Sequence, residues 1–182
     1  MAGLEDLYKE IILDHYRSPR NKGTLPTPPA TKADGFNPLC GDEVHVYIEM
    51  NGDVVSDIKL EGHGCSISQS SASLMSAAVK GKNVEQVRAI TKAFKMLMGV
   101  HATTISKAGL DPEAARAGIT NSEADLADLV ADTSNTPAVN LGDLEALQGV
   151  VKFPVRIKCA TLGWNTMLIA LDDALASASN TN

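Results

Sequence analysis

The order of apolar and polar residues predicts an amphipathic helix near the N-terminus, followed by a β-hairpin. Within residues 4–16 the apolar side chains recur at helical spacing, and Pro19 cannot continue the helix. The apolar stripe comprises Leu4, Leu7, Tyr8, Ile11 and Ile12. Residues 43–50 alternate strictly between polar and apolar positions, which is typical of a half-buried strand. The turn sequence NGD at 51–53 and a second strand-like stretch at 54–64 complete the expected hairpin.

Two helical patterns come directly after the hairpin. Residues 66–80 favour a helix that Gly81 ends, and residues 84–98 favour a second helix with its own apolar stripe. Asn83 and Gln86 have the spacing of a capping box, in which each side chain accepts a hydrogen bond from the backbone N–H of the other residue. We therefore expect the second helix to begin just after Asn83.

The remaining segments carry weaker patterns. The Pro-rich stretch 25–38 has room for a short edge strand in its latter part. Residues 141–150 read as a short amphipathic turn, and residues 151–158 as an extended approach to the last helix. That helix is expected over residues 159–178, with Cys159 at its start.

Together these elements indicate an α+β fold, in which a small antiparallel sheet of about three strands packs against several helices. The length of 182 residues suits one domain covering 1–182. Residues 101–140 are rich in Ala, Asp and Ser with short helical fragments. We expect them to form a helical or loop insertion.

Composition and charge exclude several classes of protein. The net charge of −6, from 16 Lys and Arg against 22 Asp and Glu, comes without a basic cluster, which disfavours nucleic-acid binding. The chain carries no apolar run long enough to span a membrane and no signal-peptide pattern at its start. We therefore expect a cytoplasmic protein. Its three cysteines are then free thiols or metal ligands, because the cytosol is reducing.

The candidate chemistry lies in those cysteines and one carboxylate. Cys40 and Asp42 stand two positions apart, so on an extended backbone both side chains face the same way. Cys65 and Cys159 lie at the starts of predicted helices, where unpaired N–H groups favour thiolates. Three thiolates and a carboxylate suit tetrahedral Zn²⁺, and three thiolates also suit iron–sulfur chemistry. Since no CxxC pair is present, the spacing alone is more typical of unrelated buried cysteines than of a metal site.

Longer motifs surround all three cysteines. They are LYKEIILDHYRSPRNKG, NPLCGDE, EGHGCSISQSSAS and DLEALQGVVKFPVRIKCATLGW. Together they resemble the NifU/IscU iron–sulfur cluster assembly family, and most of all its SufU branch. The IscU class usually has histidine directly before the last cysteine, where this chain has Lys158, and it has LPPVK where this chain has KFPVR at 152–156. The resemblance therefore favours the SufU branch and puts docking to an Hsp70-type chaperone in doubt.

The resemblance implies a ligand set and a role. It implies that Cys40, Asp42, Cys65 and Cys159 hold Zn²⁺, and that Cys40 accepts persulfide sulfur from a SufS-type cysteine desulfurase for the downstream iron–sulfur assembly machinery. Arg156, three residues before Cys159, would offset the negative charge of the site or assist persulfide transfer. The alternative is that Arg156 is simply an exposed charge on a strand. Whether the chain is an enzyme itself or the sulfur-accepting partner of one stays open.

Two other functions remain open. An IscU-like scaffold would bind iron and assemble a [2Fe–2S] cluster on the same three cysteines. A zinc-stabilised interaction module would bind metal without transferring sulfur. A zinc hydrolase is disfavoured, because four protein ligands leave no position for water.

The histidines carry weaker expectations. His15 is expected to be solvated or to cap a helix, and His45 to be exposed on the polar face of its strand. His63, two residues before Cys65, is the histidine best placed to support the metal site or to replace a ligand, although a structural role is more frequent at such positions.

Overall fold

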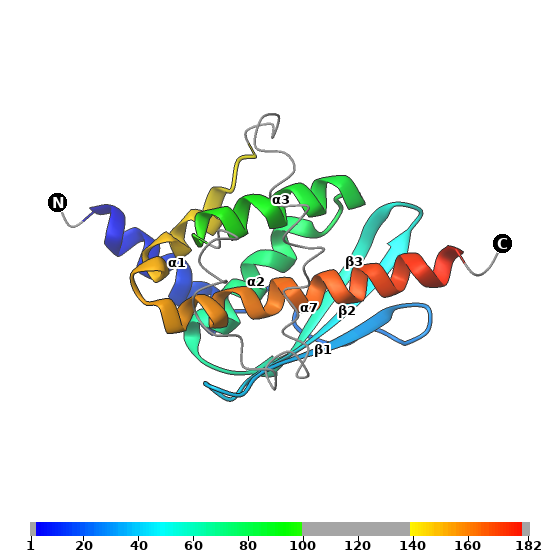
Figure 1. Ribbon diagram of the computed structural model, residues 1–182, viewed down its shortest axis with the longest axis horizontal. Helices are drawn as coiled ribbons and strands as arrows, with labels where there is room; N and C mark the ends of the chain where they lie inside the picture. The colour runs from blue at the N-terminus through cyan, green and yellow to red at the C-terminus, as the bar shows by residue number, and fades with distance from the viewer. Residues whose placement is uncertain (1–2, 100–138, 180–182) are drawn as a thin grey trace.

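The structure is a computed structural model that describes residues 3–99 and 139–179. Along the chain, one helix is followed by three strands and then by the remaining helices (Figure 1). The elements are α1 (Gly3–Arg17), β1 (Thr31–Asn37), β2 (Asp42–Asn51), β3 (Val54–His63), α2 (Ser66–Val79), α3 (Val84–Leu97), the 3-10 helix η1 (Gly142–Lys152) and α7 (Pro154–Ser179). The expected insertion 101–140 lies outside the described residues except for its last two positions.

Within the described ranges the strands form one antiparallel sheet with the order β1-β2-β3. The predicted hairpin is β2–β3, and the predicted edge strand is β1. The alternation in β2 places Val44, Val46 and Ile48 in the core, as expected for a half-buried strand. On the other face His45 and Glu49 remain partly exposed, whereas Tyr47 is only 8% exposed. The expected α+β class is confirmed.

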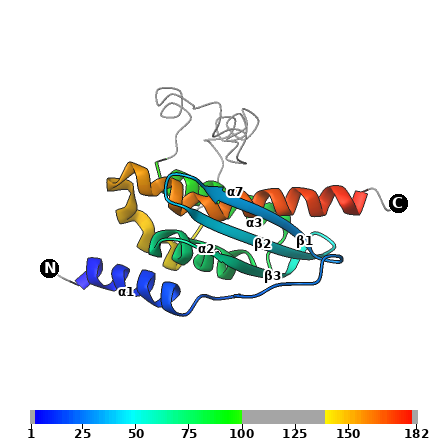
Figure 2. The ribbon, with the colours of Figure 1, turned by 90° about the horizontal axis from the view of Figure 1, so that it is seen from below.

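The helices α2, α3 and α7 all lie on the apolar side of the sheet (Figures 1 and 2). In Figure 2 the strands lie in front of these helices, and α7 runs along β1 and β2. Phe94 of α3 stacks on Trp164 of α7 with ring centroids 4.4 Å apart, and both side chains are fully buried. Burial of each such ring stabilises the fold by about 2–3 kcal/mol. This packing fixes α7 against α3, and together with the contact of α7 with β1 and β2 it fixes Cys159.

The capping box at the start of α3 is confirmed. The Asn83 side chain accepts a hydrogen bond from the backbone N–H of Gln86, and the Gln86 side chain accepts one from that of Asn83. The predicted end of α2 is also confirmed, since the helix ends at Val79 and Gly81 follows with φ of +78°. Local side-chain chemistry was therefore sufficient to predict the end of α2 and the start of α3.

The extended conformation predicted for residues 151–158 is wrong. The 3-10 helix continues to Lys152, and α7 begins at Pro154. Proline fits the first position of a helix, because its φ is suitable and its absent N–H would be unpaired there anyway. Cys159 therefore lies in the second turn of α7, one turn further into the helix than expected.

The expectation for His15 is also wrong. The imidazole is only 5% exposed, and its Nδ1 lies 2.8 Å from the hydroxyl of Ser73 in α2. Ile11 and Ile12 pack beside it against the core. Because His15 follows them by four and three residues, it shares their face of α1. The inward face of this helix is thus partly polar, whereas Leu4 near its start is 61% exposed.

Among the described residues, no helix is both long and apolar enough to cross a membrane.

Candidate metal centre

The thiol cluster lies where three parts of the fold meet. The loop between β1 and β2 carries Cys40, β2 begins with Asp42, and the second turn of α7 carries Cys159. The Sγ atoms of Cys40 and Cys159 are 3.3 Å apart, and one ligand atom from each of these three residues lies within 4.8 Å of the other two. Cys65 adjoins this group, with its Sγ 3.9 Å from Oδ2 of Asp42. The four residues that the sequence singled out are therefore neighbours in space.

Asn37 holds the loop that carries Cys40. Its side-chain oxygen accepts a hydrogen bond from the backbone N–H of Leu39 at 3.2 Å, and its carbonyl accepts one from that of Gly41 at 2.8 Å. Its amide also donates to the Sγ of Cys159 at 3.7 Å. Asn37 is only 1% exposed, and sequence reasoning missed it. The Asn-Pro pair at 37–38 is a turn signal that was available.

Asp42 is a fully buried carboxylate. Its Oδ1 accepts a hydrogen bond of 2.8 Å from the backbone N–H of Cys65. Gly64 allows this approach, because a Cβ at that position would lie 2.6 Å from the same oxygen. Within the described part of the chain, no ion pair joins Asp42 to a Lys, Arg or His. A buried carboxylate beside thiols is costly unless a cation neutralises it, so the site suits a metal ion.

Cys65 lies at the start of α2, as predicted. It is the N-cap residue, and its Sγ accepts a hydrogen bond from the backbone N–H of Ser68 at 3.4 Å. The sulfur thus lies at the positive end of the helix dipole. This hydrogen bond holds the Cys65 sulfur at the start of α2, just as the Asn37 amide contacts the sulfur of Cys159.

Arg156 reaches the cluster from the first turn of α7. A hydrogen bond to Cys65 raises the pKa of Arg156, and the negative charges of Cys65, Cys159 and Cys40 add to the effect. The guanidinium is exposed, so it approaches the thiols from the solvent side. The structure therefore brings this candidate residue to the site as well, although its segment is helical and was expected to be extended.

Cys159 is the buried thiol of the group. Burial raises its pKa far above the ordinary value, and hydrogen bonds to Cys40 and Asp42 raise it further. Coordination to a divalent cation reverses this effect, because the metal binds the thiolate. Three sulfurs and one carboxylate oxygen are a donor set that fits Zn²⁺ and also iron–sulfur chemistry.

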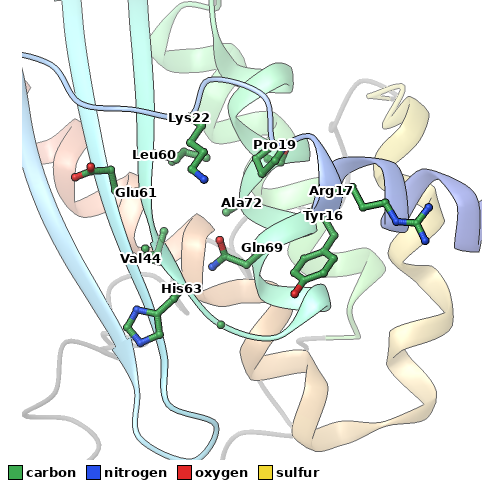
Figure 3. A pocket seen from close by; sticks show the side chains of 13 residues that line it. Tyr16, Arg17, Pro19, Lys22, Val44, Leu60, Glu61, His63, Gln69 and Ala72 are labelled. Atoms are coloured by element: carbon green, nitrogen blue, oxygen red, sulfur yellow. The ribbon is translucent and has the colours of Figure 1, made fainter.

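The candidate histidine for this site, His63, points elsewhere. Its side chain is 72% exposed, and its Nδ1 lies 3.8 Å from Glu43 on the outer face of the sheet. It lies at the edge of a pocket of about 400 Å³ between α1, β3 and α2 (Figure 3). Tyr16 and Gln69 line the same pocket (Figure 3). Gly64 is also among its lining residues, but Cys65 is not. His63 therefore lies near the thiol cluster but is not part of it.

The surroundings of the cluster are apolar and exposed. Leu39 is next to Cys40 in the chain and is 68% exposed, while Phe153 and Val155 flank the start of α7 and are 62% and 61% exposed. A groove of about 690 Å³ continues from Arg156 between α1, α2 and η1. Exposed apolar side chains grouped around a reactive site are typical of a surface that binds another protein.

Residues 7–128 match the family model described as the NifU-like N-terminal domain. The chain is 39% identical over 166 residues to the zinc-dependent sulfurtransferase SufU of Bacillus subtilis, an alignment that covers 91% of this chain and 90% of that protein. It is 31% identical over 180 residues to the iron–sulfur cluster assembly scaffold protein IscU of Streptococcus pyogenes, covering 99% and 89%. The crystal structure of FiSufU from Fervidobacterium islandicum superposes with a TM-score of 0.58 at 27% identity, covering 93% of this chain and 99% of that one.

Proposed function

This chain belongs to the NifU-like N-terminal domain family, and from that premise we propose that it accepts sulfur for iron–sulfur cluster assembly. Cys40 takes persulfide sulfur from a SufS-type cysteine desulfurase and passes it to the downstream assembly machinery. The observation that carries the proposal is the exposed Cys40 thiol, 3.3 Å from the buried Cys159 thiol and grouped with the buried Asp42. The Cys40 sulfur is thus accessible to solvent, while Cys159 and Asp42 next to it are buried.

The resident metal of this proposal is Zn²⁺, held by Cys40, Asp42, Cys65 and Cys159. The similarity to a zinc-dependent sulfurtransferase and the sulfur-rich donor set support zinc. When bound, zinc keeps thiols deprotonated at neutral pH and has no redox chemistry of its own. Asp42 supplies the single hard ligand, and its hydrogen bond from the Cys65 N–H keeps its oxygens aimed at the thiols.

Cys40 is the acceptor because of its exposure. Of the three cysteines, all within the described ranges, Cys40 is exposed, Cys65 is half-buried and Cys159 is buried. The Cys40 thiolate attacks the outer sulfur of the desulfurase persulfide. A new S–S bond forms on Cys40, the S–S bond of the desulfurase breaks, and its cysteine leaves as a thiolate. No external oxidant or reductant is required.

Arg156 is proposed to serve this transfer as a fixed positive charge. It is exposed beside the thiols and hydrogen-bonded to Cys65, so an incoming persulfide anion meets it at the entrance. A guanidinium stays protonated at all physiological pH values and partly offsets the negative charge of three thiolates and a carboxylate. This favours the approach of a second anion to an already negative site.

The desulfurase is proposed to dock on the apolar surroundings of Cys40. Leu39, Phe153 and Val155 offer side chains that a partner can cover while its persulfide reaches the thiol. This role places the protein in the cytoplasm, where reducing conditions keep the three cysteines free.

A scaffold function is the second candidate, supported by the 31% identity to an IscU scaffold protein. In that case the three cysteines would hold a [2Fe–2S] cluster. Lys158 stands beside Cys159, where IscU proteins usually have histidine, and it disfavours this function. A purified protein that is brown and contains iron and sulfide would favour the scaffold, whereas a colourless protein with one zinc per chain would favour sulfur transfer.

The test combines the zinc-loaded protein with a SufS-type cysteine desulfurase and L-cysteine. We expect mass spectrometry to find one added sulfur on Cys40, and cysteine turnover to rise several-fold over that of the desulfurase alone. Cys40→Ala should abolish both effects. Persulfide on Cys65 or Cys159 instead, or stimulation that persists in Cys40→Ala, would reject the proposed acceptor.

A further inference from the structure

One buried side chain contacts both the exposed and the buried cysteine of the cluster. Asn37 is the last residue of β1 and is only 1% exposed. Its amide Nδ2 donates a hydrogen bond of 3.7 Å to the Sγ of Cys159, and its backbone carbonyl accepts one of 3.3 Å from the N–H of Cys40. Asn37 thus contacts the two cysteines whose sulfurs lie 3.3 Å apart.

The orientation of the Asn37 amide follows from its other partner. The backbone N–H of Leu39 lies 3.2 Å from Oδ1 of Asn37, and an N–H group can only donate. This bond fixes which end of the amide is oxygen, so the nitrogen end faces the sulfur of Cys159. The side chain therefore presents an N–H donor to that sulfur.

Close packing of β1 on α7 brings the amide to the sulfur. Gly35 and Asn37 share the inward face of β1, because they are two positions apart in a strand. Thr166 and Cys159 lie two turns apart on one face of α7. A Cβ at Gly35 would collide with the Oγ1 of Thr166, so a larger residue there would force the strand away from the helix.

The three sulfurs differ in the N–H groups that they accept. The sulfur of Cys159 accepts from Asn37, and that of Cys65 accepts from the backbone of Ser68. Among the described residues, no N–H group donates to the sulfur of Cys40, which contacts Cys159. A hydrogen bond to a sulfur lone pair must be weakened before that lone pair can form a new bond, so it lowers nucleophilicity.

We propose that Asn37 determines which cysteine accepts sulfur, an inference that rests on the proposed sulfur transfer. Its amide restrains the lone pair of Cys159, so the persulfide sulfur is taken by Cys40. Transfer to Cys159 would be the same exchange, in which a new S–S bond forms on that sulfur and the desulfurase cysteine leaves as a thiolate. Asn37 acts through the two cysteines and is a positioning residue.

The same residue keeps Cys40 at the surface. Its Oδ1 closes an Asx turn on Leu39, and its carbonyl accepts the N–H groups of Cys40 and Gly41 at 3.3 Å and 2.8 Å. The turn leaves Cys40 exposed, whereas Cys159 is fully buried. Both contacts of Asn37 therefore favour Cys40 as the acceptor.

Asn37→Ser separates the two contacts. A serine hydroxyl can still close the turn by accepting from Leu39, but it is too short to reach the sulfur of Cys159. Asn37→Ala removes both side-chain contacts. Asn140→Ser is the matched control, because the Asn140 side chain closes a similar turn by accepting the N–H of Gly142 at 2.9 Å.

The first measurement replaces zinc by Co²⁺ and records the sulfur-to-cobalt charge-transfer absorption. A hydrogen bond to sulfur lowers the energy of its lone pair, so we expect the band to move to longer wavelength in Asn37→Ser and Asn37→Ala. Asn140→Ser should leave the band in place. If only Asn37→Ala moves the band, Asn37 serves the turn alone, and the inference is overturned.

The second measurement maps the added sulfur by mass spectrometry after reaction with the desulfurase and L-cysteine. In the unaltered protein and in Asn140→Ser, we expect about tenfold more persulfide on Cys40 than on Cys159. In Asn37→Ser this ratio should fall by about threefold or more, through a gain at Cys159. An unchanged ratio in this variant would also overturn the inference.

Failure of the proposed function has a different signature. In that case the unaltered protein gains no sulfur on any cysteine, while the cobalt spectra still show whether the Asn37 amide bonds the sulfur of Cys159. Circular dichroism checks that each variant is folded. The decisive comparison uses Asn37→Ser and the unaltered protein, so it does not require Asn37→Ala to fold.

Discussion

At the scale of single residues, the thiol cluster depends on two buried polar side chains that carry no sulfur. Asn37 and Asp42 are register partners at the end of the β1–β2 pair, so they close the loop that presents Cys40. Each also reaches a second cysteine, Asn37 through its amide to Cys159 and Asp42 through its oxygen to the Cys65 N–H. The positions of all three sulfurs are thereby coupled to one turn.

Gly64→Ala tests this coupling. The added methyl would collide with Oδ1 of Asp42 and displace the carboxylate, so we expect zinc affinity to fall about tenfold. Competition with a chromophoric chelator measures the change. Gly149→Ala is the control, because a Cβ there meets no atom within 4 Å. Equal zinc affinity in both variants would show that the contact between Gly64 and Asp42 does not position the ligand.

At the scale of elements, local patterns predicted most of the fold but could not place the thiols together. The alternation in β2 and the capping box at Asn83 are properties of neighbouring residues, and both were predicted correctly. The start of α7 was mispredicted, because burial of a long helix outweighed the β-branched residues around Pro154. The proximity of Cys40 to Cys159 arises from packing of α7 against β1, and no periodicity encodes it. Only the resemblance of the longer motifs predicted that proximity.

Across the whole molecule, one buried hydrogen-bond network ties the N-terminal helix to the rest. The Ser73 hydroxyl accepts the backbone N–H of Arg20 at 2.7 Å and contacts Nδ1 of His15. The hydroxyl keeps its own hydrogen, which it can donate to an unprotonated Nδ1 of His15. Burial lowers the pKa of His15 and the charge of Arg20 lowers it further, while Asp14 and Asp143 oppose the shift.

This network makes the stability of the fold depend on pH. A group whose pKa is lowered by folding binds its proton more weakly in the folded state, so protonation favours unfolding. The stabilisation is complete above the ordinary histidine pKa of about 6.5 and is lost as the pH falls from there through the lowered value. One proton changes the free energy of unfolding by at most about 1.4 kcal/mol per pH unit.

His15→Asn isolates the effect, because its side-chain oxygen can still accept from Ser73 but does not titrate. Urea unfolding of the zinc-loaded protein between about pH 7 and pH 5 should show a shallower loss of stability in the variant. Parallel pH profiles for the two proteins would assign the pH dependence to other groups.

X-ray absorption at the zinc edge tests the central claim most directly, namely that sulfurs from residues 40, 65 and 159 and the oxygen of Asp42 surround one zinc ion. For the purified protein with one zinc per chain, we predict three sulfur neighbours at about 2.3 Å and one oxygen neighbour at about 2.0–2.2 Å. Fewer than three sulfur neighbours, or a shell of nitrogen and oxygen alone, would contradict the account.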